Sequence, residues 1–82
     1  MTTTGTTARE LQNMIMDKLR AVYPECDEII ETVNVTPASG PRGKWVAETV
    51  LQPGALEPED CHRARAAITH DLQRQFHLVS AT

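Results

Sequence analysis

Apolar residues recur at helical spacing only after a polar start to the chain. Residues 1–6 have no apolar anchor and no periodicity, so they are predicted to be a disordered tail before a single domain over residues 7–82. Thr7 and Glu10 match the capping box that satisfies free backbone N–H groups at a helix start. A helix from Thr7 towards Pro24 then carries one apolar stripe, made of Leu11, Met14, Ile15, Leu19 and Val22.

Two segments rich in β-branched residues follow, 29–36 and 44–51, and the turn-forming run 37–43 separates them. This order predicts an antiparallel hairpin with a long loop. Pairing Val35 with Trp45 gathers the bulkiest side chains on one face, whereas a slip by one residue opposes two glutamates. The predicted inner face is Ile29, Val33, Val35, Trp45, Ala47 and Leu51, and the other face carries Ile30, Val46 and Val50 among Thr32, Asn34 and Glu48.

A second helix is predicted to begin near Glu57, because Pro58 suits a first helical position. Leu56 and Cys61 have the spacing of a hydrophobic staple at that start. Leu78 and Val79 either extend this helix or form a short third strand. The chain is therefore predicted to be an α+β domain of order α-β-β-α(-β), with two helices packed on one face of an antiparallel hairpin.

The two cysteines, Cys26 and Cys61, are expected to be free thiols, with a single bridge as the alternative. The start of the chain has no apolar run typical of a secretory signal, and no segment approaches the roughly 20 apolar residues of a membrane span. These features predict a soluble cytoplasmic protein, and thiols stay reduced in that compartment.

A net charge of −3 argues against a general nucleic-acid binder, because neutralisation of phosphates dominates such affinity. Arg42, Lys44 and Trp45 nevertheless lie at the predicted hairpin tip, where two cations and an aromatic ring could contact a base or a phosphate. The competing interpretation, which we favour, is a polar tip with Trp45 packed in the core.

Lys18 and Arg65 each lie within the apolar stripe of their helix. Long cations usually lie at the edge of such a stripe, and the alternative is that both flank one groove and hold an anion or a partner's carboxylate. His62, His70 and His77 share one sector of the predicted last helix, but lie too far apart along it to share a metal. No catalytic, cofactor-binding or metal-binding motif is found.

From Glu28 to Phe76 the pattern resembles the soluble C-terminal domain of cation-diffusion-facilitator transporters, especially over Leu56-Glu57-Pro58-Glu59-Asp60-Cys61-His62. This resemblance implies a dimer, and it implies that the position of His62 can bind zinc. The chain departs from the family in lacking acidic ligands after the last helix. The same α-β-β-α order also resembles ribosome-maturation and BolA-type proteins.

These observations predict a small, non-enzymatic protein-interaction or regulatory module without a cofactor. We expect a homodimer, because the second face and the edges of a two-stranded sheet stay open. One alternative is a nucleic-acid or ribosome-associated accessory protein that uses the hairpin tip. Another is a metal-responsive module.

Overall fold

The computed structural model describes residues 3–40 and 43–80. Its elements along the chain are β1 (Thr4–Thr7), α1 (Ala8–Val22), α2 (Pro24–Ile29), β2 (Ile30–Pro37), β3 (Trp45–Leu51), α3 (Glu59–Gln75) and β4 (Phe76–Ser80). They form two small sheets, one of β2 and β3 and the other of β1 and β4.

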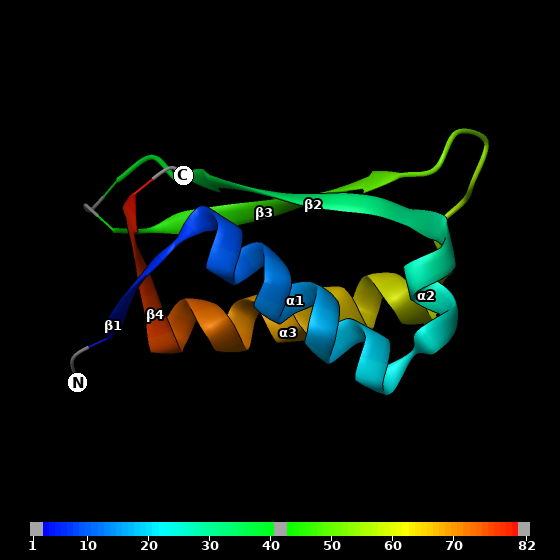
Figure 1. Ribbon diagram of the computed structural model, residues 1–82, viewed down its shortest axis with the longest axis horizontal. Helices are drawn as coiled ribbons and strands as arrows, with labels where there is room; N and C mark the ends of the chain where they lie inside the picture. The colour runs from blue at the N-terminus through cyan, green and yellow to red at the C-terminus, as the bar shows by residue number, and fades with distance from the viewer. Residues whose placement is uncertain (1–2, 41–42, 81–82) are drawn as a thin grey trace.

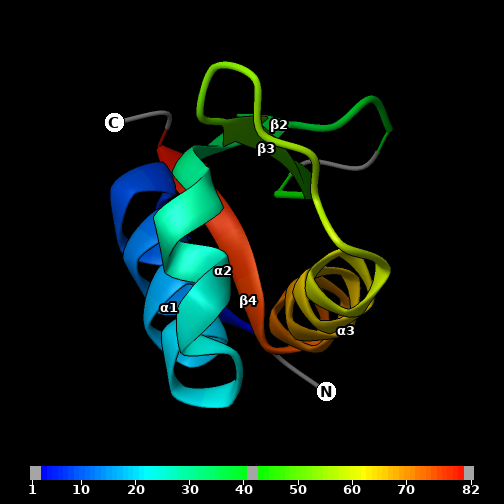
Figure 2. The ribbon, with the colours of Figure 1, turned by 90° about the vertical axis from the view of Figure 1, so that its right-hand side faces the viewer.

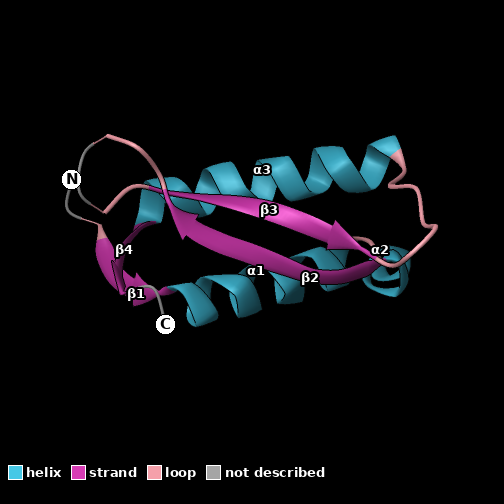
Figure 3. Cartoon of the chain, turned by 90° about the horizontal axis from the view of Figure 1, so that it is seen from above, coloured by secondary structure: helices cyan, strands magenta, loops and turns pink. Residues whose placement is uncertain are grey.

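The β2–β3 hairpin forms one layer, and α1 and α3 form the other (Figures 1 and 2). Seen from above, the hairpin lies between the lines of these two helices (Figure 3). The described helices all lie on the same side of the hairpin. No described element packs over its other face, although Nε2 of Gln12 in α1 reaches round the β2 edge and donates to Oγ1 of Thr32. The predicted α+β class, with helices packed on an antiparallel hairpin, is confirmed.

The start of α1 follows the capping pattern. The backbone N–H of Glu10 donates to Oγ1 of Thr7 at 3.2 Å, and the helix ends at Val22, just before Pro24. Helix α2 is not predicted from the sequence. It is a short helix of six residues with proline in its first turn. This helix delays the strand by one residue, so that β2 begins at Ile30.

The predicted hairpin register is wrong by two residues. Val35 lies opposite Ala47, and Trp45 lies opposite Pro37, which the sequence analysis assigned to the loop. Because side chains alternate with a period of two, the error leaves most residues on their predicted faces. An irregularity between Ile30 and Thr32 is the exception, since it turns Ile30 into the core.

The core lies between the hairpin and the helices and is mostly aliphatic. Its fully buried members include Leu11, Ile15 and Leu19 from the predicted stripe of α1. Trp45 is only 2% exposed, so the interpretation that places it in the core is confirmed. Around these residues pack half-buried side chains that include Val35, Ala47, Leu51, Ile68, Phe76 and Leu78.

Cys26 and Cys61 form a disulfide, so the prediction of free thiols is wrong. The bridge joins α2 to the first turn of α3, with a Cα–Cα distance of 5.9 Å, and both residues are buried. The prediction relied on an expected reducing compartment. It did not foresee α2, the element that brings Cys26 to the same place.

The chain start also differs from its prediction. Residues 4–7 form β1, which pairs in parallel with β4, so the segment expected to be disordered is a strand over this range. Met1 and Thr2 lie outside the described residues. Leu78 and Val79 belong to β4, which pairs with β1 rather than adding a third strand to the hairpin ladder.

Helix α3 begins at Glu59, with Pro58 as the preceding cap residue, two residues later than predicted. Leu56 is 88% exposed, so the predicted staple between Leu56 and Cys61 is not formed. The carboxylate of Glu57 instead receives the guanidinium of Arg65, with Nε–Oε2 at 3.3 Å.

Candidate binding site

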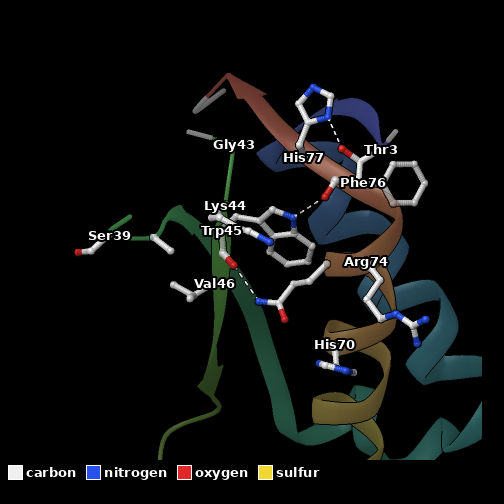
Figure 4. Close-up of a pocket in the computed structure, with 12 residues that line it drawn as sticks. Thr3, Ser39, Gly43, Lys44, Trp45, Val46, His70, Arg74, Phe76 and His77 are labelled. Atoms are coloured by element: carbon white, nitrogen blue, oxygen red, sulfur yellow. Dashed lines mark hydrogen bonds between the residues drawn. The ribbon is translucent and has the colours of Figure 1, made fainter. Parts of the chain in front are cut away.

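A cleft of about 660 Å³ lies between the hairpin tip and the end of α3 (Figure 4). The hairpin supplies one wall, and α3 with the start of β4 supplies the other. The lining residues come from three separate parts of the chain: Thr3; Ala38, Ser39, Gly43, Lys44, Trp45 and Val46; and His70, Gln73, Arg74, Phe76 and His77.

Trp45 fixes the two walls to each other. Its indole Nε1 donates to the backbone oxygen of Phe76 at 3.2 Å, and its own backbone oxygen accepts from Nε2 of Gln73 at 2.8 Å (Figure 4). Burial of an indole is favourable when its N–H finds a partner, as it does here. The floor of the cleft is therefore a packed, hydrogen-bonded unit.

Gly43 attaches the hairpin loop to β4. Its backbone oxygen accepts from the N–H of Leu78 at 2.8 Å, and its φ of +91° is a conformation that side chains disfavour. A Cβ at this position would lie 3.1 Å from Cβ of His77. Glycine therefore serves both the turn and the close approach, which bring the loop beside β4.

The charged groups at the cleft are of one sign. Lys44 comes from the hairpin and Arg74 comes from the exposed side of α3, where His70 adds a polar ring. Among the described lining residues there is no aspartate or glutamate. The ring of His77 is turned towards β1, where Nδ1 is 2.7 Å from Oγ1 of Thr3. The cleft is thus a positively charged site in a chain with a net charge of −3.

The residues predicted at the hairpin tip differ in their exposure. Lys44 is exposed at the cleft, and Arg42 lies outside the described residues. Trp45 lines the floor, but its burial leaves no exposed ring face on which a base could stack.

Lys18 and Arg65 do not line the cleft. Lys18 is exposed on α1, and Arg65 pairs with Glu57, each side chain being 13% exposed. The pair satisfies Arg65 within the chain. The predicted anion groove flanked by Lys18 and Arg65 therefore stays a prediction, with Arg65 already paired to Glu57.

The three histidines are spread over the molecule. His62 is exposed beside Glu57, His70 faces the cleft, and His77 lies in β4 rather than in the last helix, which is a correction. Within the described ranges, no group of three or more histidine, cysteine or acidic side chains could hold a metal ion. Cys61, next to His62, is occupied by the disulfide.

A second open surface is the outer face of the hairpin. Its cross-strand pairs are Thr32 with Val50, Asn34 with Glu48, and Thr36 with Val46. A polar pair thus lies between two pairs that each contain a valine, and Val46 is 41% exposed. We call these six residues the outer face.

Sequence reasoning found Lys44 but missed His70 and Arg74 as its neighbours. His70 and Arg74 come close to Lys44 because β4 pairs with β1 and because the Leu78 N–H donates to Gly43. Neither interaction can be predicted from a local sequence pattern.

No family model, curated protein or solved structure matches the chain. The resemblance to the cation-diffusion-facilitator domain therefore stays a prediction. In the described part of the chain, none of the helices is both long and apolar enough to span a bilayer.

Proposed function

We propose that the chain is a non-enzymatic interaction module that associates with a second copy of itself through the outer face. The observation that carries this proposal is the one-sided cover of the hairpin, whose described helices all pack on the inner face (Figure 2). Exposed apolar groups and uncovered strands are typical of association sites.

The outer face is complementary to itself. A twofold axis that runs along the strands, between two stacked faces, places Asn34 of each copy opposite Glu48 of the other. The amide can donate to the carboxylate. The Thr36–Val46 pair of one copy lies opposite the same pair of the other copy, and the Thr32–Val50 pairs are matched in the same way. Such mutual contacts are what a twofold interface requires.

The dimer should be weak, because the face of two short strands is small beside the roughly 800 Å² per partner of a standard interface. Sedimentation equilibrium from ten to several hundred micromolar tests it, and the apparent mass should rise from 9.1 kDa towards twice that value. A mass of one chain across the whole range contradicts the proposal.

Val50→Lys places a charge in the outer face and should restore the monomer mass. Val22→Lys is the matched control, because Val22 is 59% exposed on α1, away from this face. If both variants dimerise like the wild type, association uses another surface. Circular dichroism shows whether each variant is folded.

The buried disulfide bears on where the module works. Disulfides persist in oxidising compartments and are rare in the cytoplasm. We therefore place the module in an oxidising compartment instead of the cytoplasm expected from the sequence. Expression in the two environments, followed by measurement of free thiols, tests this assignment.

Neither alternative function gains an observation from the fold. Trp45 is buried, which removes the stacking surface of the nucleic-acid hypothesis. No set of metal ligands is found in the described residues, so the metal-responsive hypothesis rests on resemblance alone.

A further inference from the structure

The cations at the cleft differ from several others on the molecule in having no partner. Arg20, Arg63 and Arg65 each lie within salt-bridge distance of a carboxylate. Among the described residues, Lys44 and Arg74 make no such pair. Both of these unpaired cations line the cleft, and unpaired cations attract an anion.

The neighbouring acidic groups do not line the cleft. Asp71 lies one turn before Arg74 on α3, but its carboxylate accepts from Nε2 of Gln75 at 2.8 Å and makes no salt bridge with Arg74. Glu48 belongs to the outer face of the hairpin and does not line the cleft.

The remaining lining suits an organic anion better than a bare ion. Ala38, Val46 and Phe76 supply apolar surface, whereas Ser39 and His70 supply polar groups. The cavity volume of about 660 Å³ falls within the range of sites for small molecules.

The walls are held in place before any ligand arrives. Trp45 and Gln73 join the hairpin to α3, and the backbone oxygen of Lys44 accepts from the N–H of Ala38 at 3.0 Å. A site whose backbone is already ordered loses less conformational entropy on binding.

We propose that the cleft binds a small organic oxyanion, a phosphate ester or a carboxylate on an apolar body. Lys44 and Arg74 supply the positive charge for the oxyanion, and the apolar body lies against the apolar part of the lining. Arginine and lysine are the usual partners of such groups, and arginine can donate two parallel hydrogen bonds to one oxyanion.

Nuclear magnetic resonance of the full chain provides the test, with phenyl phosphate, benzoate, inorganic phosphate and benzyl alcohol as probes. Phenyl phosphate or benzoate should shift the Trp45 indole N–H and the Gly43 amide in a saturable way. Probes of this size bind in roughly the millimolar range, so titration to about 20 mM is needed. A larger response to phenyl phosphate assigns phosphate esters, and a larger response to benzoate assigns carboxylates.

Substitutions identify the two cations. Lys44→Gln and Arg74→Gln should each weaken binding about five- to tenfold, and the double variant should abolish it. Lys18→Gln is the matched control, since it removes the same charge from an exposed position on α1. Its affinity should stay within twofold of the wild type.

Four results would overturn the proposal. They are no saturable shift at 20 mM, equal weakening by Lys18→Gln, equal binding of benzyl alcohol, and equal binding of inorganic phosphate. The second indicates general charge attraction, the third an apolar cleft, and the fourth a site for the bare ion. Each titration is carried out below the concentration at which the chain dimerises, so the result does not depend on self-association.

Discussion

The two ends of the helical layer are held together in different ways (Figure 1). At the α2 end, the Cys26–Cys61 disulfide links α2 to α3 covalently. At the cleft end, the link is made by hydrogen bonds, from Trp45 to Phe76, from Gln73 to Trp45, and from Leu78 to Gly43. The first end depends on two side chains, and the second depends on the packing of one indole and the conformation of one glycine.

The ends also differ in how their charges are used. The arginines near the disulfide are paired, Arg20 with Asp27 and Arg65 with Glu57. The hydrogen bond from Arg20 to Asp27 raises the pKa of that guanidinium. At the cleft end, Lys44 and Arg74 have no carboxylate partner among the described residues. The comparison indicates that one end is committed to holding the fold and that the other retains charge for a ligand.

The largest effect should come from the indole that connects the walls of the cleft. Trp45→Ala removes a buried ring and its hydrogen bond, and it should lower the free energy of unfolding by about 3–5 kcal/mol. Urea denaturation followed by circular dichroism measures this. Trp45→Phe is the comparison variant, because it keeps one buried aromatic ring while it removes the indole N–H and the second ring, and it should therefore lose less stability than alanine. A loss below about 1 kcal/mol for the alanine variant would show that the cleft end is held by something else.

The disulfide should have the next largest effect. Its cysteines are separated by 35 positions, and a closed loop of that length corresponds to about 3–4 kcal/mol in the chain-entropy model. The double variant Cys26→Ala with Cys61→Ala should lose this amount. Hydrogen exchange should quicken most in α2, while the Trp45 indole N–H should keep more of its protection. Equal loss of protection at both ends would mean that the molecule unfolds as one cooperative unit. The α2 end and the cleft end would then not open independently.

The two ends were not equally predictable from sequence. At the α2 end, Pro24 correctly marks where α1 stops, but a proline-initiated helix as short as α2 has too few residues to show a periodicity. The pairing of Cys26 with Cys61 was therefore not predicted, although the sequence contains both cysteines. A disulfide depends on the relative placement of two elements, and pattern reasoning places elements only along the chain.

At the cleft end the limitation is different. The segment 4–7 has no alternation of apolar and polar residues, and its partner β4 lies at the opposite end of the chain. Parallel pairing between such distant segments leaves no local signal. The hairpin register failed for a local reason, since β2 extends to Pro37 and an irregularity follows Ile30. The faces survived because an error of two residues preserves side-chain alternation.

A smaller effect is expected at the loop. Gly43→Ala forces a side chain into a positive-φ conformation and towards His77, which should cost about 1–2 kcal/mol. The change should quicken exchange of the Leu78 amide, which donates to Gly43, more than exchange within α2. Gly40→Ala is an informative control, because its φ is also positive and a Cβ there meets no atom within 4 Å. If the two variants lose equal stability, the contact with His77 contributes nothing beyond backbone strain.

The smallest effect concerns the start of α1, which leaves the cleft end through Thr7. Oγ1 of Thr7 accepts from the backbone N–H of Glu10, and the loss of such a cap costs about 1 kcal/mol. Thr7→Ala should therefore lower the free energy of unfolding by that amount, and Thr7→Ser should restore most of it by supplying the same oxygen. Thr7 is also the last residue of β1, so its side chain can support both the helix cap and the β1–β4 pair. Alanine removes the capping oxygen and the methyl environment of threonine together, whereas serine keeps the oxygen and removes only the methyl group. If serine restores stability while exchange in β4 remains fast, the methyl group of Thr7 supports the β1–β4 pair. If serine restores both, the cap alone explains the residue, and the cleft end depends on Trp45 and Gly43 without help from α1.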